Sequence, residues 1–189
     1  LAAGDITFTA NTATIATRAI TLTATDVSQV YGDSDATLSV TASANGLAST
    51  DTLAEVTGTL TRESGSNVGN YDVALGTGSK ASNYSVTFDT DNNAYEITPK
   101  ALTATASVAG KTYDGNDDAS VTLSLAGLVS GEDLGQTVTA SFDSVNAGTR
   151  TATIDSFQLD DGTNGLESNY SLAAGDITFT ANTATIATR

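Results

Sequence analysis

The first and last eighteen residues of the chain are identical. Residues 1–18 read LAAGDITFTANTATIATR, and residues 172–189 repeat the same letters at an offset of 172 − 1 = 171 residues. Strands tolerate many sequences, so a match of this length indicates duplication and not a shared structural constraint. The repeat predicts a piece of a tandem array, slightly longer than one period. Such arrays are typical of proteins that need reach or many copies of one surface, and seldom of enzymes.

The 171-residue period contains two related modules. Each opens on a strand-like segment and then reaches a tyrosine, Tyr31 in the first and Tyr113 in the second. The later matches are GLASTDTL (46–53) with GLVSGEDL (127–134), NVG (67–69) with NAG (146–148), and SNYS (82–85) with SNYS (168–171). We assign the modules to 19–100 and 101–189, whose lengths add up to the period. Residues 1–18 are then the terminal hairpin of a truncated preceding module.

Alternating apolar residues predict short strands in both modules. The pattern is clear at 20–24 in the first module and at 121–125 and 138–142 in the second, and Gly, Asn and Asp bound the segments. Threonine fills the opposite faces, which suits a pleated surface. The expected fold class is all-β, with an elongated tandem of small Ig-like or β-grasp-like modules.

Each module is expected to end on a hairpin. The two hairpins pair 84–88 with 95–97, and 177–179 with 184–186. The candidates for a short helical turn are 49–55 and 130–136, because Ser or Thr precedes acidic residues there. In the N-terminal copy, Ile6, Phe8 and Ile15 are expected to lack the core that their counterparts enter in the second module.

No flexible linker separates the modules. Residues 96–103 lead directly from the last strand of the first module into the first strand of the second, and Pro99 is the one proline of the chain. Proline fixes φ and donates no backbone hydrogen bond, so it stiffens this connection. We therefore expect a rod and not a string of loosely tethered beads.

Composition excludes several functional classes. The chain has 22 acidic and 7 basic residues, a net charge of −15, so nucleic acid and anionic membrane surfaces are not expected partners. Cys and His are absent, which removes the usual nucleophiles, bases and transition-metal ligands. We therefore expect no enzymatic activity and no cofactor.

Three acidic clusters are candidates for calcium sites, because carboxylate and amide oxygens are the ligands that calcium prefers. They are Asp89, Asp91 and Asn93; Asp114, Asp117 and Asp118; and Asp160 and Asp161. No glutamate follows at the twelfth position to complete an EF-hand loop. Asp and Asn also favour turns that hold no metal, so turn formation is the alternative interpretation.

Tyr31 and Tyr113 stand at equivalent positions before Gly- and Asp-containing turns. We interpret them as residues that cap the core, with each hydroxyl bonded to the turn beside it. The alternative is an aromatic contact for a sugar or a protein partner.

These motifs resemble two known families. The YGD motif at 31–33 is similar to the YGX type of MBG domain, and the KTYDG motif at 111–115 is similar to the YDG domain. The first module ends on the expected closing residues at 98–100 (TPK), whereas the second has ATR at 187–189.

Domains of these families recur in tandem in very large bacterial surface and secreted adhesins, including filamentous-haemagglutinin-like proteins. The resemblance therefore implies that this chain is part of such an adhesin. It implies an extracellular stalk or extender at the bacterial cell surface, which spaces an adhesive tip from the cell or contributes to biofilm matrix. The implied partners are neighbouring repeats of the same chain. The alternative function is a repeat module that itself binds a glycan or host protein.

Overall fold

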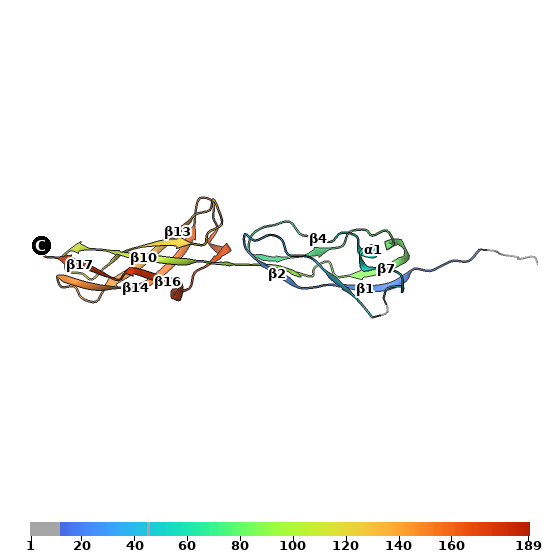
Figure 1. Cartoon of the computed structure of the whole chain (residues 1–189), viewed down its shortest axis with the longest axis horizontal. Helices are drawn as coiled ribbons and strands as arrows, with labels where there is room; N and C mark the ends of the chain where they lie inside the picture. Colours follow the sequence, from blue (N-terminus) through green and yellow to red (C-terminus); the bar gives the residue numbers. More distant parts are fainter. Residues whose placement is uncertain (1–11, 45) are drawn as a thin grey trace, which may run out of the picture. The chain divides into compact units, whose positions relative to one another are not determined.

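β-Strands are the predominant regular structure, and the described residues contain one short α-helix (Figure 1). The computed structural model describes residues 12–44 and 46–189. The all-β prediction is confirmed. The described part of the chain has no helix with the length and apolar character needed to cross a membrane.

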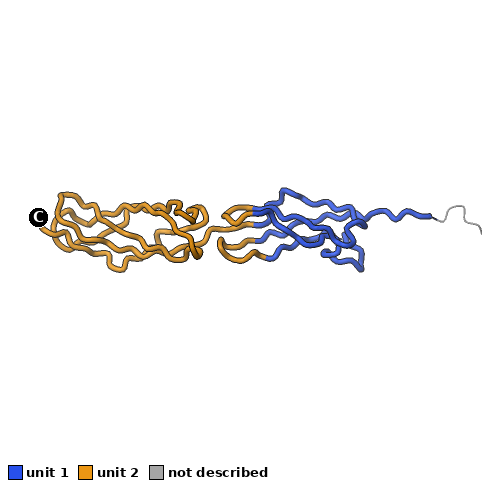
Figure 2. The backbone as a smooth tube through the Cα atoms, turned by 90° about the horizontal axis from the view of Figure 1, so that it is seen from above, with its two compact units in different colours: residues 1–27, 37–64, 71–95 blue, residues 28–36, 65–70, 96–189 orange. Residues whose placement is uncertain are grey.

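Contacts group the chain into two compact units (Figure 2). Unit 1 comprises the described residues of Leu1–Val27, with Thr37–Ser64 and Tyr71–Tyr95. Unit 2 comprises Ser28–Ala36, Gly65–Asn70 and Glu96–Arg189. Two segments of the first sequence module, Ser28–Ala36 and Gly65–Asn70, therefore pack with the second module.

The first ten elements all lie before residue 100. They are β1 (Arg18–Ala24), β2 (Val27–Val30), β3 (Val40–Ala42), α1 (Leu53–Thr57), β4 (Thr61–Arg62), β5 (Gly69–Tyr71), β6 (Val73–Ala74), the 3-10 helix η2 (Ala81–Asn83), β7 (Tyr84–Phe88) and β8 (Tyr95–Thr98). The sheets have the orders β3-β1-β7, β2-β8-β5 and β4-β6. Strand β1 is antiparallel to β3 and parallel to β7, with Arg18 opposite Tyr84.

The core of unit 1 follows from the alternation of β1. Ile20 and Leu22 are buried, while Thr21 between them and Thr23 after them face solvent. They pack with Val56 from α1 and Tyr84 from β7. Burying apolar side chains of this size contributes about 1.5–3 kcal/mol each, so this cluster contributes substantially to the stability of the unit.

The remaining elements all lie in unit 2. They are β9 (Lys100–Ala101), β10 (Thr103–Ala109), β11 (Lys111–Thr112), β12 (Ser120–Ala126), β13 (Leu134–Phe142), β14 (Gly148–Asp161), η3 (Glu167–Asn169), β15 (Tyr170–Ser171), η4 (Ala174–Asp176), β16 (Ile177–Ala181) and β17 (Thr183–Ala187). The sheets have the orders β12-β10-β16, β11-β17-β14-β13 and β15-β9. The core of unit 2 includes a cluster around Ala106 and Leu123 and another around Phe142 and Ile186.

The predicted terminal hairpins are wrong in both modules. Strand β7 pairs with β1, whereas β8 belongs to the sheet of β2 and β5. In the same way β16 pairs with β10, and β17 pairs with β14 and β11. Each turn therefore carries the chain from one sheet to another, and residues such as Tyr84 of β7 and Ile97 of β8 are buried in the core instead of facing each other across a ladder.

One of the two predicted helical turns forms. Thr52 caps α1 and makes a reciprocal capping box with Glu55, close to the predicted segment. The prediction for 130–136 is wrong, since β13 begins at Leu134. Gly135 stands where α1 has Ala54, and glycine costs about 1 kcal/mol in a helix.

The two copies of the repeated segment lie in different surroundings. Most of the hairpin expected at 1–18, including Ile6 and Phe8, lies outside the described residues. Ile15 is 95% exposed, whereas Ile186, its counterpart at the 171-residue offset, is 1% exposed. The prediction that Ile15 lacks a core is confirmed.

Candidate functional site

Two phenols share one carboxylate in unit 2. The Tyr31 hydroxyl donates to Oε1 of Glu132 at 2.6 Å, and the Tyr170 hydroxyl donates to Oε2 of the same side chain. The two rings meet edge to face, with centroids 5.4 Å apart. Tyr31 is 9% exposed and Tyr170 is 6% exposed. We call Tyr31, Glu132 and Tyr170 the tyrosine–carboxylate cluster.

Local backbone geometry places the two tyrosines of the cluster. The Tyr31 amide donates to the Thr98 carbonyl, at the end of β8, at 2.9 Å. Gly32 follows with φ +81°, and a Cβ there would lie 2.4 Å from Cγ2 of Val129. Only glycine permits both the left-handed backbone and this approach. Tyr170 starts β15 beside β9, and its hydroxyl accepts from the Val129 amide at 3.0 Å.

A buried asparagine holds a second loop in unit 2. Asn169 is 1% exposed, and its Oδ1 accepts from the Val68 amide at 2.8 Å. Its Nδ2 donates to Oδ1 of Asn67 at 3.0 Å. Together with the tyrosine–carboxylate cluster, Asn169 accounts for the membership of both loops, 28–36 and 65–70, in unit 2.

Electrostatics keep both phenols protonated. The hydrogen bond to Glu132, then burial, raise the pKa of Tyr31 above its usual 10.0. Burial, then the hydrogen bond to Glu132, raise the pKa of Tyr170 to about 12. A tyrosine is already a hydrogen-bond donor at neutral pH, and the raised pKa values extend the donor state of both residues to more alkaline solution. The arrangement suits a structural bond, because a general acid or base works best with a pKa near the operating pH.

Unit 1 contains a counterpart of the same site. The Tyr84 hydroxyl donates to Oδ2 of Asp51 at 2.6 Å and accepts from the Ala48 amide at 3.0 Å. We call Ala48, Asp51 and Tyr84 the Asp51 site. Lys80 occupies the second oxygen of Asp51, at 2.8 Å from Oδ1, and also pairs with Glu55 at 3.1 Å. Lys80, then Tyr84, lower the pKa of Asp51.

The structure corrects our interpretation of the two motif tyrosines. Tyr31 bonds to Glu132, 101 residues away, and not to the turn beside it. Tyr113 is 40% exposed and caps no core. The matched GLASTDTL and GLVSGEDL segments carry an acid, Asp51 or Glu132, at the same place. That match is a signal in the sequence, but nothing in it indicates which loop the acid meets.

The acidic cluster at 89–93 forms a turn. Oδ1 of Asp89 accepts from the Asp91 amide at 3.1 Å, and Oδ1 of Asp91 accepts from Nδ2 of Asn93 at 3.4 Å. Asn93 has φ 46°, and its amide donates to Asp72 at 2.8 Å. Asparagine tolerates this left-handed conformation well. The oxygens therefore stabilise the loop that leads from β7 to β8.

The other two clusters also bond to nearby protein groups. Asp114 pairs with Lys111 at 3.0 Å, and this contact lowers the pKa of its carboxyl. Asp160 accepts from Thr137 at 3.0 Å, and Asp161 accepts from the Glu167 amide at 2.8 Å. The remaining members engage through their backbones: the Asp117 carbonyl accepts from Phe142, and the Asp118 amide donates to Asn116. Among the described residues, no group of three or more acidic side chains converges as a metal site would require.

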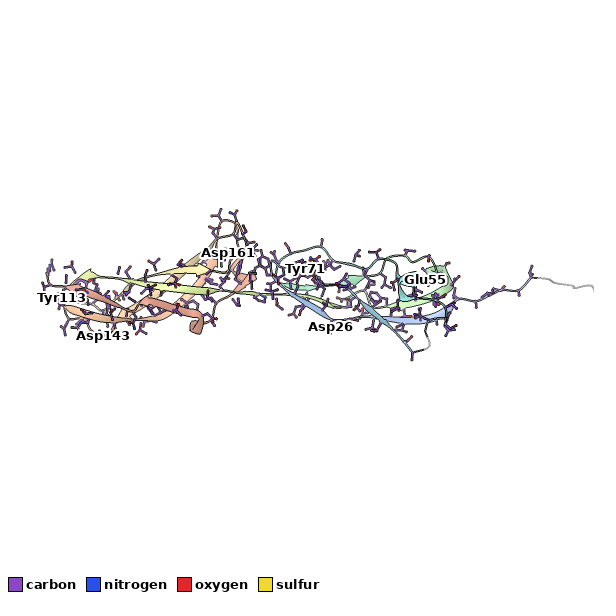
Figure 3. All side chains as sticks on the ribbon, in the orientation of Figure 1. Asp26, Glu55, Tyr71, Tyr113, Asp143 and Asp161 are labelled. Atoms are coloured by element: carbon purple, nitrogen blue, oxygen red, sulfur yellow. The ribbon has the colours of Figure 1, made fainter. Side chains whose placement is uncertain are left out.

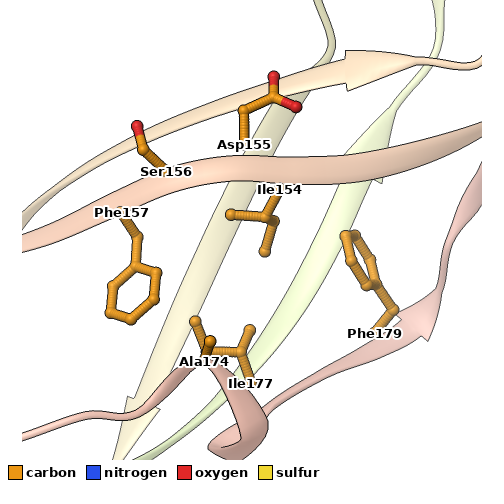
Figure 4. A pocket seen from close by; sticks show the side chains of 7 residues that line it. All are labelled: Ile154, Asp155, Ser156, Phe157, Ala174, Ile177 and Phe179. Atoms are coloured by element: carbon orange, nitrogen blue, oxygen red, sulfur yellow. The ribbon is translucent and has the colours of Figure 1, made fainter.

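An open apolar hollow of about 390 Å³ lies in unit 2 between β14 and β16 (Figure 4). Ile154, Phe157, Ile177 and Phe179 line it. Asp155 also borders the hollow but accepts a hydrogen bond from Ser141 on the neighbouring strand. The hollow is an opening in the core around Leu123.

Comparison with protein families accounts for nearly all of the described chain. The family model of the MBG domain (YGX type) matches residues 20–98, and that of the YDG domain matches residues 98–186. The chain is an MBG domain followed by a YDG domain. No curated protein and no solved structure matches it. The motif tyrosine of the MBG domain is thus Tyr31, in the cluster, and that of the YDG domain is the exposed Tyr113.

Proposed function

We propose that this chain is a tandem-repeat stalk or extender segment of a large bacterial surface or secreted adhesin. The observation that carries the proposal is the identity of residues 1–18 and 172–189, which indicates repetition of the MBG–YDG pair. The segment spaces an adhesive tip from the cell or contributes to biofilm matrix. Its location is extracellular, at the bacterial surface, and its partners are neighbouring repeats.

The tyrosine–carboxylate cluster supports a load-bearing role. Non-covalent contacts that add to the one covalent connection restrain the relative motion of consecutive domains, which suits a stalk. Within unit 2, Glu132 and Asn169 of the YDG domain hold two loops of the MBG domain. Hydrogen bonds to an ionised carboxylate are about twice as strong as neutral ones, so they suit such a connection. The segment works without catalysis and without a cofactor in this proposal.

Small-angle X-ray scattering of the 189-residue chain tests the proposal. A stalk segment should give a maximum dimension well above that of a globule of this length. A radius of gyration near the globular expectation of about 16 Å would contradict it. Tyr31→Phe provides a matched variant, which should broaden the distribution of interatomic distances by weakening the hold on one loop.

Ligand binding by the repeat itself is the competing proposal. The feature that favours it is the hollow lined by Phe157 and Phe179, since aromatic rings are common in sugar-binding sites. A glycan array and a pull-down with host proteins separate the two functions. A spacer should give no signal in either experiment, whereas a binding module should lose its signal on Phe179→Ala.

A further inference from the structure

Tyr113 repeats the backbone setting of Tyr31. The Tyr113 amide donates to the Ala187 carbonyl at 2.8 Å, as the Tyr31 amide does to Thr98 at 2.9 Å. A glycine with positive φ follows in both turns, Gly32 at +81° and Gly115 at +89°. Tyr113 lies at the end of unit 2 that carries the C-terminus (Figure 3). Its ring is 40% exposed, whereas that of Tyr31 is 9% exposed.

The Asp51 site repeats the setting of Glu132 and Tyr170. In both, a tyrosine hydroxyl donates to the acid and accepts from a backbone amide three residues before that acid, at Ala48 or Val129. The last residue of the preceding 3-10 helix differs in its surroundings, because Asn169 is buried and Asn83 is exposed. In unit 1, Asp51 and Tyr84 therefore correspond to Glu132 and Tyr170. No tyrosine among the described residues occupies the place that Tyr31 has in the tyrosine–carboxylate cluster.

The spacing along the chain connects the two halves. Thr98 binds the Tyr31 amide, and Lys100, two residues later, pairs with Tyr170 in the β9–β15 ladder. Ala187 binds the Tyr113 amide, and Arg189 follows two residues later. Arg189 is the copy of Arg18, because 189 − 171 = 18, and Arg18 pairs with Tyr84 in the β1–β7 ladder.

In both cases a step of two residues leads from the carbonyl that binds the motif tyrosine's amide to the residue that pairs with the site tyrosine, so the Tyr84 of the next repeat should stand to Tyr113 as Tyr170 stands to Tyr31. We propose that Tyr113 of one repeat docks on the Asp51 site of the next repeat, where its hydroxyl donates to Asp51. The occupant of the site is thus another copy of this chain's own YDG domain. The inference rests on the proposed tandem-repeat function and identifies the partner surfaces.

Side-chain size is compatible with this docking. Gly32 lies against Val129, which leaves no room for a Cβ at that point. At the Asp51 site the smaller Ala48 stands in place of Val129, and Asp114 follows Tyr113. Lys80 offsets one of the two negative charges of Asp51 and Glu55, and Asp114 brings its own partner, Lys111, at 3.0 Å.

A second contact is expected beside the first. Asn146-Ala147-Gly148 corresponds to Asn67-Val68-Gly69, whose Asn67 and Val68 bond to Asn169. The neighbouring Val145 is 37% exposed at the same turn. In the array, the Ala147 amide of one repeat should therefore donate to Asn83 of the next. Ile15, exposed here, would be covered as its counterpart Ile186 is.

The test compares the 189-residue chain with a chain of two periods, in which residues 19–189 are repeated after Arg189. Tetranitromethane nitrates accessible tyrosines, and mass spectrometry follows the peptide that contains Tyr113. The longer chain has two copies of Tyr113, and only the first, half of the total, precedes an MBG domain. That half should react about fourfold more slowly, the ratio of the 40% exposure of Tyr113 to the 9% of Tyr31. The other half should keep the rate of the shorter chain.

A matched pair of variants controls for folding. Ala48→Val in the second MBG domain of the longer chain should restore the fast rate, because the added methyl groups fill the space beside Asp114. The same change in the first MBG domain should leave both rates unaltered. One fast phase for every Tyr113 copy, with an extended scattering profile, overturns the docking and leaves the stalk intact. A slow half with a globular radius of gyration supports the docking and overturns the stalk.

Discussion

At the residue scale, two equivalent carboxylates, Glu132 and Asp51, accept from different kinds of donor. Glu132 accepts a phenol on each oxygen, as a carboxylate with several lone-pair sites can. Asp51 accepts a phenol, Tyr84, on one oxygen and the Lys80 ammonium on the other. Lys80 therefore occupies in unit 1 the oxygen that Tyr31 occupies in unit 2, and the remaining lone pairs of Asp51 can still accept a further donor. Neither acid is left partly unpaired, which would be costly.

Tyr31→Phe should destabilise unit 2. The change removes one hydroxyl and leaves Oε1 of Glu132 without its donor, and hydrogen bonds to charged groups contribute about 1.5–3 kcal/mol. Urea denaturation followed by circular dichroism should show a loss of about that size. Tyr113→Phe is the control, because this exposed ring should change the free energy by less than about 0.5 kcal/mol. Equal losses in both variants would contradict the assignment.

The raised tyrosine pKa values predict a loss of stability in alkali. The pKa of Tyr170 is about 12 in the folded state and 10.0 for the free side chain, so the folded state holds the proton more tightly. This contribution is fully present below pH 10 and is lost as the pH rises toward 12. Unfolding free energies measured across that range should fall less steeply for Tyr170→Phe than for the parent chain. Parallel profiles would refute the proposed linkage.

At the element scale, a five-residue helix depends on its cap. Helix α1 is too short to be stable by propensity alone, and the capping box satisfies backbone groups at its first turn. The Thr52 amide donates to Oε2 of Glu55 at 2.9 Å, and Thr52 Oγ1 accepts from the Glu55 amide at 3.4 Å. The same Glu55 pairs with Lys80, so the cap is tied to the loop that precedes η2.

Thr52→Ala should destabilise unit 1. Loss of an N-cap side chain costs about 0.5–2 kcal/mol, and here it also frees Glu55 from its reciprocal bond. Thermal unfolding monitored by circular dichroism measures the effect. Ser49→Ala serves as a control, because Ser49 is exposed and precedes the cap. A melting temperature unchanged by Thr52→Ala would mean that packing of Val56 alone maintains the helix.

Sequence alternation predicts the strands better than their pairing. The buried positions of β1, including Ile20 and Leu22, follow from period two. The partners do not follow, because a turn rich in Asp and Asn connects strands of one sheet or of two sheets equally well. The parallel pairing of β1 with β7 joins residues that lie 66 positions apart, Arg18 and Tyr84, and local signals contain no information about it. The tyrosine–carboxylate cluster escaped prediction for the same reason.

At the scale of the whole molecule, charge is the dominant property. Acidic residues outnumber basic ones 10 to 3 in residues 19–100 and 11 to 3 in 101–189. Like charges on neighbouring domains repel one another at low ionic strength, which favours dispersed, soluble chains. Two of the few cations pair with acids: Lys80 bridges Asp51 and Glu55, and Lys111 pairs with Asp114.

Salt should stabilise the chain, and calcium should add nothing specific. Screening relieves the repulsion and levels off once the Debye length falls below about 10 Å, near 0.1 M salt. A true calcium site would instead raise the melting temperature at millimolar calcium on a background of about 0.15 M salt, where screening is nearly complete. The oxygens of Asp89 and Asp91 already accept hydrogen bonds within their own turn, so binding would have to break these contacts. Differential scanning calorimetry with calcium, and with magnesium as the control, should show equal and small shifts. A shift specific to calcium that disappears in the Asp89→Asn, Asp91→Asn double variant would establish the loop as a site.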